Sequence, residues 1–214
     1  MRTFYQKHKK TLSLFDGFFL NNTVLERGLV IAPIIVAGNT MKNAVMLSIA
    51  FVIITFITVF ISSFIPKKFP YTIRAILHTV LAAIVFIPVS ILLQNFFPEA
   101  VYKTGIFLPL LVTNSLIVSK SESRFFKKTR GKMAVDLISH VLGFMLVACL
   151  VGALREILGN GTFWGNSLGM SETAPALMFP FAGFIILGFL AAALQKFRRY
   201  LNQEPKREPE ASNE

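Results

Sequence analysis

The uncharged positions of this chain fall into four long runs, each of which is long enough to cross a lipid bilayer. Three runs contain 22–24 consecutive residues without an acidic or basic side chain. The remaining long run holds 22 residues and one acidic side chain, Asp136. Because an α-helix needs about 20 apolar residues to span the hydrocarbon core, these runs predict four membrane helices, at residues 43–66, 75–99, 133–154 and 174–195.

Two shorter uncharged runs lie at matching places in the two halves of the chain. Residues 28–41 form a run of 14 and residues 105–119 a run of 15. Neither can cross an apolar layer of about 30 Å as one regular helix at about 1.5 Å per residue. Each contains a glycine, then a proline, then an asparagine: Gly28, Pro33 and Asn39 in the first, and Gly105, Pro109 and Asn114 in the second.

Paired short segments with glycine and proline interruptions indicate a central site in inverted-repeat membrane proteins. We therefore expect two broken helices that approach each other near the membrane midplane, with irregular backbone close to Pro33 and Pro109. Pro33, Asn39, Pro109 and Asn114 are the candidates for this central site. An asparagine in unwound backbone can bind a ligand or satisfy freed carbonyl groups, and it can equally cap a helix, so both readings of Asn39 and Asn114 remain open.

The six segments together predict an all-α integral membrane protein in which the first and fourth helices are broken. The chain is 54% hydrophobic with a mean hydropathy of +0.61, which is more apolar than a soluble domain of 214 residues requires. We expect a basic interfacial segment at residues 1–27, one membrane domain at 28–200 and a disordered tail at 201–214.

The net charge of +11 is distributed as expected for a membrane protein rather than a nucleic-acid-binding protein. In the six-crossing arrangement, 18 of the 22 basic residues fall on one side, whereas Lys42, Lys103 and Arg155 fall on the other. This positive-inside pattern predicts that both termini are cytoplasmic and that the basic side contacts anionic lipid headgroups. We expect membrane lipid as a partner and no nucleic acid.

Ionisable groups inside the predicted spans are candidates for function because burying them in a membrane is costly. Asp136 and His140 are four residues apart and can pair on one helix face, although Asp136 can equally be an interfacial cap. His78 fits a satisfied interfacial histidine. Arg155 and Glu156 fit a local ion pair that anchors the outer end of the fifth span. The sequence contains no catalytic motif and no metal-ligand spacing.

Two motifs carry a resemblance to a known family: Gly105-Ile-Phe-Leu-Pro-Leu-Leu-Val-Thr-Asn114 and Leu154-Arg-Glu-Ile-Leu-Gly-Asn-Gly-Thr162. They resemble the small membrane subunits of the Rnf electron-transport complex and of the sodium-translocating NADH:quinone oxidoreductase (Nqr). The second motif and the predicted cytoplasmic N-terminus look most like the Rnf E and Nqr D proteins. The likeness covers nearly all of residues 18–200.

The resemblance implies six transmembrane helices in two inverted three-helix repeats, in the plasma membrane of a bacterium. It also implies a role in a complex that moves electrons across the membrane, coupled to movement of Na⁺ or H⁺. The implied partner is an inverted paralogue of the Rnf A or Nqr E type, and flavin is expected in other subunits. Family members share an iron–sulfur cluster with that paralogue, and two cysteines come from each protein.

At the cluster positions this chain departs from the family pattern. Ala32 stands where the family has a cysteine before the first proline, and Ser115 stands where it has one after Thr-Asn. The single cysteine, Cys149, lies at neither place and fits a small buried hydrophobic residue. Because cluster irons are held by thiolates, we expect no cofactor bound by this chain alone and no conventional shared cluster.

Two explanations of this departure remain: the complex has rerouted its electrons through flavin or quinone, or the scaffold has been reused. The main alternative function is a transporter, or the substrate-binding part of one, that uses the inverted-repeat crevice for a small molecule, since half-helix ends suit ions and anionic groups. A third possibility is a structural protein that holds another membrane protein.

Overall fold

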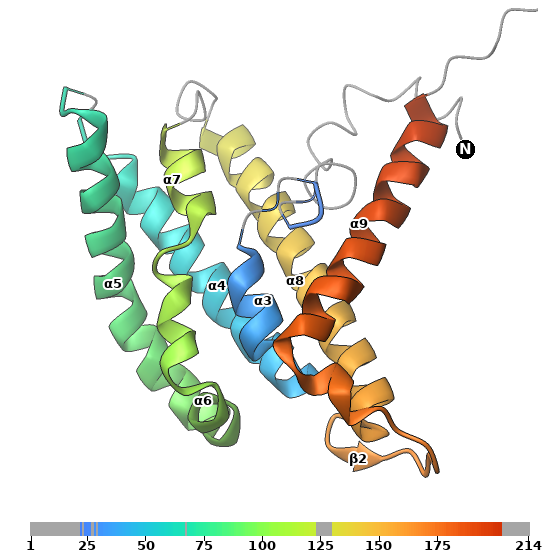
Figure 1. The fold of residues 1–214 in the computed structure, drawn as a ribbon. Helices are drawn as coiled ribbons and strands as arrows, with labels where there is room; N and C mark the ends of the chain where they lie inside the picture. Colours follow the sequence, from blue (N-terminus) through green and yellow to red (C-terminus); the bar gives the residue numbers. More distant parts are fainter. Residues whose placement is uncertain are drawn as a thin grey trace, which may run out of the picture.

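Four long helices run through the whole length of the molecule (Figure 1). The computed structural model describes residues 22, 24–26, 28, 30–66, 68–122 and 130–202. Only the four long helices are both long and apolar enough to span a membrane singly among these residues, which confirms the four long predicted spans. They are α4 (Met41–Ser62), α5 (Tyr71–Phe96), α8 (Arg130–Asn160) and α9 (Pro180–Asn202).

Shorter elements connect the long helices. The chain enters α4 through α3 (Ile31–Ala37), and α5 leads into α6 (Pro98–Thr104) and the 3₁₀-helix η1 (Gly105–Leu111). After η1 comes α7 (Ser115–Glu122). Between α8 and α9 lie a hairpin of β1 (Thr162–Phe163) and β2 (Asn166–Ser167) and the 3₁₀-helix η3 (Pro175–Met178).

The second short segment, residues 105–119, contains the second half of a bent pair of helices. The helical stretches Pro98–Thr104 and Phe107–Ser119 meet at an angle of 85°. The backbone turns at Gly105, whose φ of +52° lies in a region that glycine adopts without steric cost. The described residues thus hold four single spans and one bent pair, while the complete six-helix arrangement stays a prediction.

The sixth predicted span begins later than expected. Pro175 lies in η3, outside the membrane helix, and α9 starts at Pro180. The continuous apolar run from residue 174 suggested a single helix, but proline lacks a backbone N–H and is best tolerated in the first turn of a helix, where that group has no partner. The second predicted span likewise ends at Ser62 rather than at residue 66.

The core lies where α4 packs against α8. The Phe51 and Phe144 rings stack with their centroids 3.9 Å apart. Nearer the start of α4, Gly152 lies so close to Ala44 and Thr40 that a Cβ would come within 2.9 Å of both. Small residues such as Gly152 allow membrane helices to approach closely.

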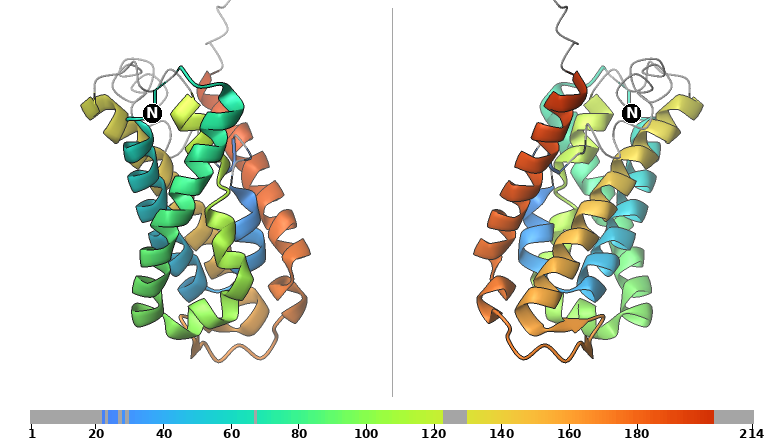
Figure 2. Two further views of the ribbon diagram at one scale, coloured as in Figure 1. Left: turned by 90° about the vertical axis from the view of Figure 1, so that its left-hand side faces the viewer. Right: turned by 90° about the vertical axis from the view of Figure 1, so that its right-hand side faces the viewer.

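The two ends of the bundle differ in composition. We call one end the hairpin end, because α6 and the β1–β2 hairpin cover it (Figures 1 and 2). We call the opposite end, where α4 and α9 end and α5 and α8 begin, the basic end (Figure 1). Lys68 and Arg74 lie around the start of α5, and Lys196, Arg198 and Arg199 lie in the last turns of α9. The predicted segments 1–27 and 201–214 and the loop at 123–129 lie almost entirely outside the described residues.

Candidate functional site

The two short segments come together inside the bundle. Helix α3 packs against η1, which confirms that the segments approach each other. The 3₁₀ geometry around Pro109 agrees with the irregular backbone expected there. Pro33 itself is the third residue of the regular helix α3, where a missing N–H costs no hydrogen bond, so the irregular backbone lies near this proline and not at it. The irregular backbone follows at residues 38–40 and precedes it at Val30, whose φ is +60°.

Asn114 is a buried helix cap. Its Oδ1 accepts hydrogen bonds from the backbone N–H groups of Leu116 (2.8 Å) and Ile117 (3.2 Å) at the start of α7. Its Nδ2 donates to Thr55 Oγ1 on α4 at 2.9 Å. Asn114 therefore lies at the end of the irregular stretch, caps the start of α7 and links α7 to α4.

Asn22 makes the same set of contacts in the first half of the chain. Its Oδ1 accepts from Val24 N (2.9 Å) and Leu25 N (3.3 Å), and its Nδ2 donates to the carbonyl oxygen of Gly143 on α8 at 2.9 Å. The sequence comparison of the two halves paired Asn39 with Asn114, whereas the hydrogen bonds pair Asn22 with Asn114. The repeated i+2 and i+3 pattern was visible only in the coordinates.

Asn39 lies in a different part of the molecule from Asn114. Its Oδ1 accepts a hydrogen bond of 2.9 Å from Asn43 Nδ2, at the start of α4. Thr55, the partner of Asn114, lies 12 residues beyond Asn43, about 18 Å along a helix that rises 1.5 Å per residue. The two asparagines therefore do not share one site in this structure.

Arg155 is fully buried and joins three elements. Its Nη1 donates to the carbonyl oxygens of Ile35 (2.8 Å) and Gly38 (3.4 Å) at the end of α3. Its Nε and Nη2 donate to the carbonyls of Leu177 (3.0 Å) and Met178 (2.6 Å) in η3. The planar guanidinium supplies several donors in fixed directions, so one side chain can satisfy carbonyls that the ends of two short helices leave open.

Glu156 faces a different set of partners. Its Oε2 accepts from Met41 N at 2.7 Å, and its Oε1 accepts from Gly165 N at 2.8 Å and from Thr162 Oγ1 at 3.2 Å. The carboxylate thus joins the start of α4 to the hairpin. The predicted local ion pair between Arg155 and Glu156 was wrong: adjacent residues on a helix do not face each other, and each is satisfied by groups of other elements.

A group of buried polar side chains lies between the Phe51–Phe144 pair and the basic end. We call this group the polar interior, and it comprises Thr55, Thr58, Ser62, His78, Asn114, Ser139 and His140, each at most 3% exposed. His78 Nδ1 lies 3.0 Å from Ser62 Oγ, so this ring nitrogen has the kind of partner expected for a satisfied histidine. Among the described residues, Thr58 Oγ1 and Ser139 Oγ have no hydrogen-bond partner.

Asp136 is half-buried on α8, one helical turn before His140. This places it between the polar interior and the first turn of α8, which begins at the basic end. Both readings of this aspartate, as a partner of His140 and as an interfacial group, agree with that position.

The positions that carry cysteine in the resembled family offer no thiolate here. Ala32 is in the first turn of α3 and is exposed on the surface of the chain. Ser115 is the first residue of α7. Cys149 lies on α8 beside Ser48 of α4. An alanine methyl group cannot bind iron, so the donor set of these two positions does not fit a cluster held by thiolates.

Comparison with known proteins places the chain in a family. The family model described as "Rnf-Nqr subunit, membrane protein" matches residues 11–197. The E component of the ion-translocating oxidoreductase complex of Haemophilus ducreyi is 32% identical over 86% of this chain and 88% of its own length. The E component of the same complex in Glaesserella parasuis is 34% identical over 76% of this chain and 71% of its own length.

A relative from the second branch of the family is also similar. The D component of the Na⁺-translocating NADH-quinone reductase of Pseudoalteromonas translucida is 26% identical over 87% of this chain and 92% of its own length. The family match runs from before α3 to the last turns of α9 and includes both broken segments. The chain therefore belongs to the Rnf-Nqr family of membrane subunits.

Proposed function

We propose that this chain is a non-catalytic membrane subunit of an ion-translocating electron-transport complex, in the position that the E component holds in Rnf-type assemblies. The observation that carries this proposal is the near full-length similarity to such E components. The proposed partner is an inverted paralogue together with flavin-containing subunits of a bacterial plasma membrane. The transporter alternative has no comparable support.

We further propose that the membrane domain consists of two inverted three-helix repeats. Helices α3 and α7 run in opposite directions through the bundle (Figure 1). The matched asparagines support the same symmetry: Asn22 bonds to α8, a long helix of the opposite half, and Asn114 bonds to α4. Phe51 and Phe144, from the same two helices, stack against each other as residues close to a pseudo-two-fold axis would.

The polar interior is the proposed route of the coupling cation through one half of this protein. Hydroxyl and carbonyl oxygens are suitable ligands for Na⁺ and can also carry protons through water. A buried hydroxyl without a partner costs free energy that a bound cation or water would recover, which supports such a role for Thr58 and Ser139. The stacked pair Phe51–Phe144 closes the route toward the hairpin end.

A direct test replaces the two hydroxyls without leaving a cavity. We expect Thr58→Val with Ser139→Ala to leave the complex assembled and its thermal stability unchanged or higher, because no hydrogen bond is lost. Electron-driven uptake of radioactive sodium, or of protons, into membrane vesicles is expected to fall several-fold. Thr72→Val, at an exposed position of α5, is the matched control. Unchanged uptake with the double variant would contradict the proposed route.

The test of the proposed role in the complex is purification through a tag on this chain. Flavin absorbance and a co-purifying membrane protein of the same family are the expected results. Recovery of this chain alone, or with an ATPase, in several mild detergents would contradict the proposal and favour a transporter.

A further inference from the structure

The hairpin end holds a charged cavity that the electron-transport role does not use. Its volume is about 390 Å³, within the range of about 300–1,000 Å³ found for small-molecule sites. The start of α4, helix α6, the end of α8 and the hairpin form its walls. Its charged and amide side chains are Lys42, Asn43, Glu99, Lys103, Glu156 and Asn160.

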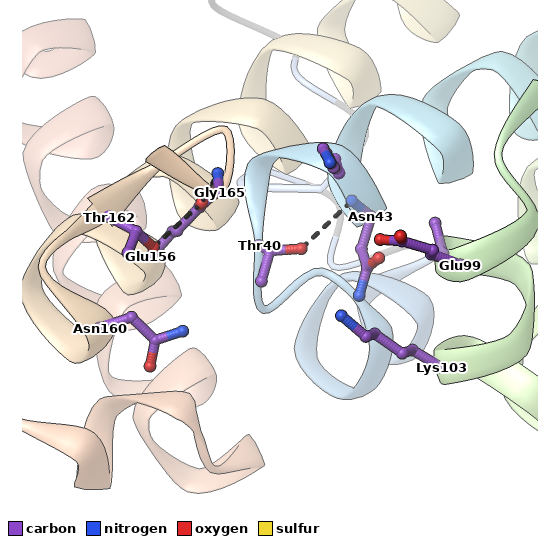
Figure 3. Close-up of a pocket in the computed structure, with 10 residues that line it drawn as sticks. Thr40, Asn43, Glu99, Lys103, Glu156, Asn160, Thr162 and Gly165 are labelled. Atoms are coloured by element: carbon purple, nitrogen blue, oxygen red, sulfur yellow. Dashed lines mark hydrogen bonds between the residues drawn. The ribbon is translucent and has the colours of Figure 1, made fainter. Parts of the chain in front are cut away.

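Side chains from opposite walls converge on this space. Glu99 and Lys103 extend from α6 toward α4, and the amide of Asn160 points inward from the end of α8 (Figure 3). Asn43 is 5% exposed and occupies the wall between them. The carboxylate of Glu156 already accepts hydrogen bonds from Met41 N, Gly165 N and Thr162 Oγ1. It therefore lines the cavity but is held by these bonds and is not the acceptor for a ligand.

Apart from Glu156, the charged groups of the cavity are the ammonium groups of Lys42 and Lys103 and the carboxylate of Glu99. In the part of the chain that the structure describes, no ion pair joins Lys42 or Lys103 to Glu99 or Glu156. The positive end of the dipole of α4, a helix of 22 residues, points toward the same cavity and favours a negative group. A ligand that complements this set carries a phosphate for the lysines and a positive amine for Glu99.

The surroundings of the cavity are those of a membrane interface. Helix α6 turns by 85° relative to the following helical stretch and lies across the end of the bundle (Figure 2). It buries Ala100 and Thr104 and exposes Tyr102 to 88%. Phe96, 72% exposed at the end of α5, provides apolar surface next to it. Exposed aromatic residues at the ends of membrane helices are typical of the headgroup region.

We propose that this cavity binds the headgroup of a zwitterionic phospholipid such as phosphatidylethanolamine. Lys42 and Lys103 contact the phosphate, Glu99 contacts the amine, and the acyl chains follow the exposed apolar surface of α5 and η1. The headgroup would join α4, α6 and the hairpin, three elements that are far apart in the sequence. This site is independent of the electron-transport function proposed above.

The experiment is native mass spectrometry of the full chain, purified in mild detergent with equal amounts of phosphatidylethanolamine, phosphatidylcholine and phosphatidylglycerol. We expect the wild type to retain phosphatidylethanolamine preferentially. Lys42→Gln with Lys103→Gln should reduce retention at least about threefold, as expected for two partly exposed charge contacts. Glu99→Gln should keep phospholipid binding but remove the preference for the ethanolamine headgroup over choline.

Lys196→Gln is the control for retention of phosphatidylethanolamine, because Lys196 is an exposed lysine on α9 at the opposite, basic end, where anionic and not zwitterionic headgroups are expected. Equal lipid retention by the double lysine variant, the control and the wild type would overturn the proposal.

A second experiment measures whether Lys42 and Lys103 are protected from an amine-reactive reagent. Protection by phosphatidylethanolamine nanodiscs and not by inorganic phosphate supports a lipid. Equal protection by inorganic phosphate without lipid retention would assign the cavity to a soluble phosphate and overturn the lipid assignment.

Discussion

The guanidinium Nη1 of Arg155 donates a 2.8 Å hydrogen bond to the carbonyl oxygen of Ile35, 120 residues away in the sequence. Through this contact the end of α8 fixes the end of half-helix α3, while the other donors of the same side chain hold η3. The position of the first broken segment therefore depends on a residue of the second half of the chain.

Arg155→Met should destabilise the protein strongly. The methionine fills much of the volume but leaves two buried and two partly buried carbonyl oxygens without their donor, at a cost of about 1–3 kcal/mol for each acceptor that finds no water. We expect the thermal unfolding midpoint in detergent to fall by about 5–10 °C, measured by the fluorescence of the single tryptophan, Trp164. Arg155→Lys should recover only part of the loss, since one ammonium group cannot reach both α3 and η3.

The control for the arginine variants is Arg199→Gln, on the exposed surface of α9. This variant removes the same charge without breaking a buried contact, so we expect a change in the unfolding midpoint of less than about 2 °C. Equal effects of Arg155→Met and Arg199→Gln would show that the buried contacts contribute little to stability.

The cap at Asn114 allows a prediction that separates its two hydrogen-bonding roles. Asn114→Asp keeps the oxygen that caps α7 but loses the amide that donates to Thr55, whereas Asn114→Ala loses both. We expect the alanine variant to be less stable than the wild type by about 1–2 kcal/mol and the aspartate variant to lie between them. Thermal unfolding with Thr113→Ala as a neighbouring exposed control measures the difference. An alanine variant as stable as the wild type would rule out the cap as a stabilising contact.

Hydropathy was sufficient to locate most of the membrane helices, because a span of about 20 apolar residues is a local property of the sequence. The same pattern placed the start of the sixth span too early, since apolar residues continue through η3 to Pro180. Glycine and proline correctly marked two interrupted segments, but proline in a first helical turn, such as Pro33, gives no sign of whether the backbone is regular.

The contacts of Arg155 and Glu156 could not be read from the sequence. An adjacent Arg-Glu pair gives the same local signal whether the two residues meet each other or point to different elements. Their partners at Ile35, Met178, Met41 and Gly165 lie at least nine residues away and are backbone groups, which carry no sequence signature. The sequence shows only an ionisable pair at the end of an apolar span. This indicates that Arg155 and Glu156 are candidates for function, but it does not identify their hydrogen-bond partners.

The distribution of charge predicts the orientation of the chain in the membrane. With Cys149 replaced by serine, single cysteines are introduced at Lys127 in the predicted cytoplasmic loop and at Ser167 in the hairpin. A membrane-impermeant maleimide added to intact cells should label Ser167→Cys strongly and Lys127→Cys only after the membrane is permeabilised. Strong labelling at residue 127 in intact cells would reverse the orientation and place the phospholipid cavity in the inner leaflet.

The residues at the family's cysteine positions predict the metal content of the complex. Ala32 and Ser115 supply no thiolate, so a partner with two cysteines would leave half of the iron coordination to weaker donors in an apolar setting. We expect the anaerobically purified complex to contain no stoichiometric cluster at this interface, as measured by iron content and by electron paramagnetic resonance of the reduced sample. A cluster signal that disappears with Ser115→Ala would contradict this expectation.

The converse experiment restores both thiolates. Ala32→Cys with Ser115→Cys beside a cysteine-bearing partner should allow a cluster to form, because Ala32 is exposed in the chain and can face such a partner. The iron content of the anaerobically purified complex measures the gain, with each single substitution as a control that still lacks one ligand. If the doubly substituted complex still binds no iron, the two half-helices are not placed for a shared cluster, and the route of the electrons must pass through other subunits.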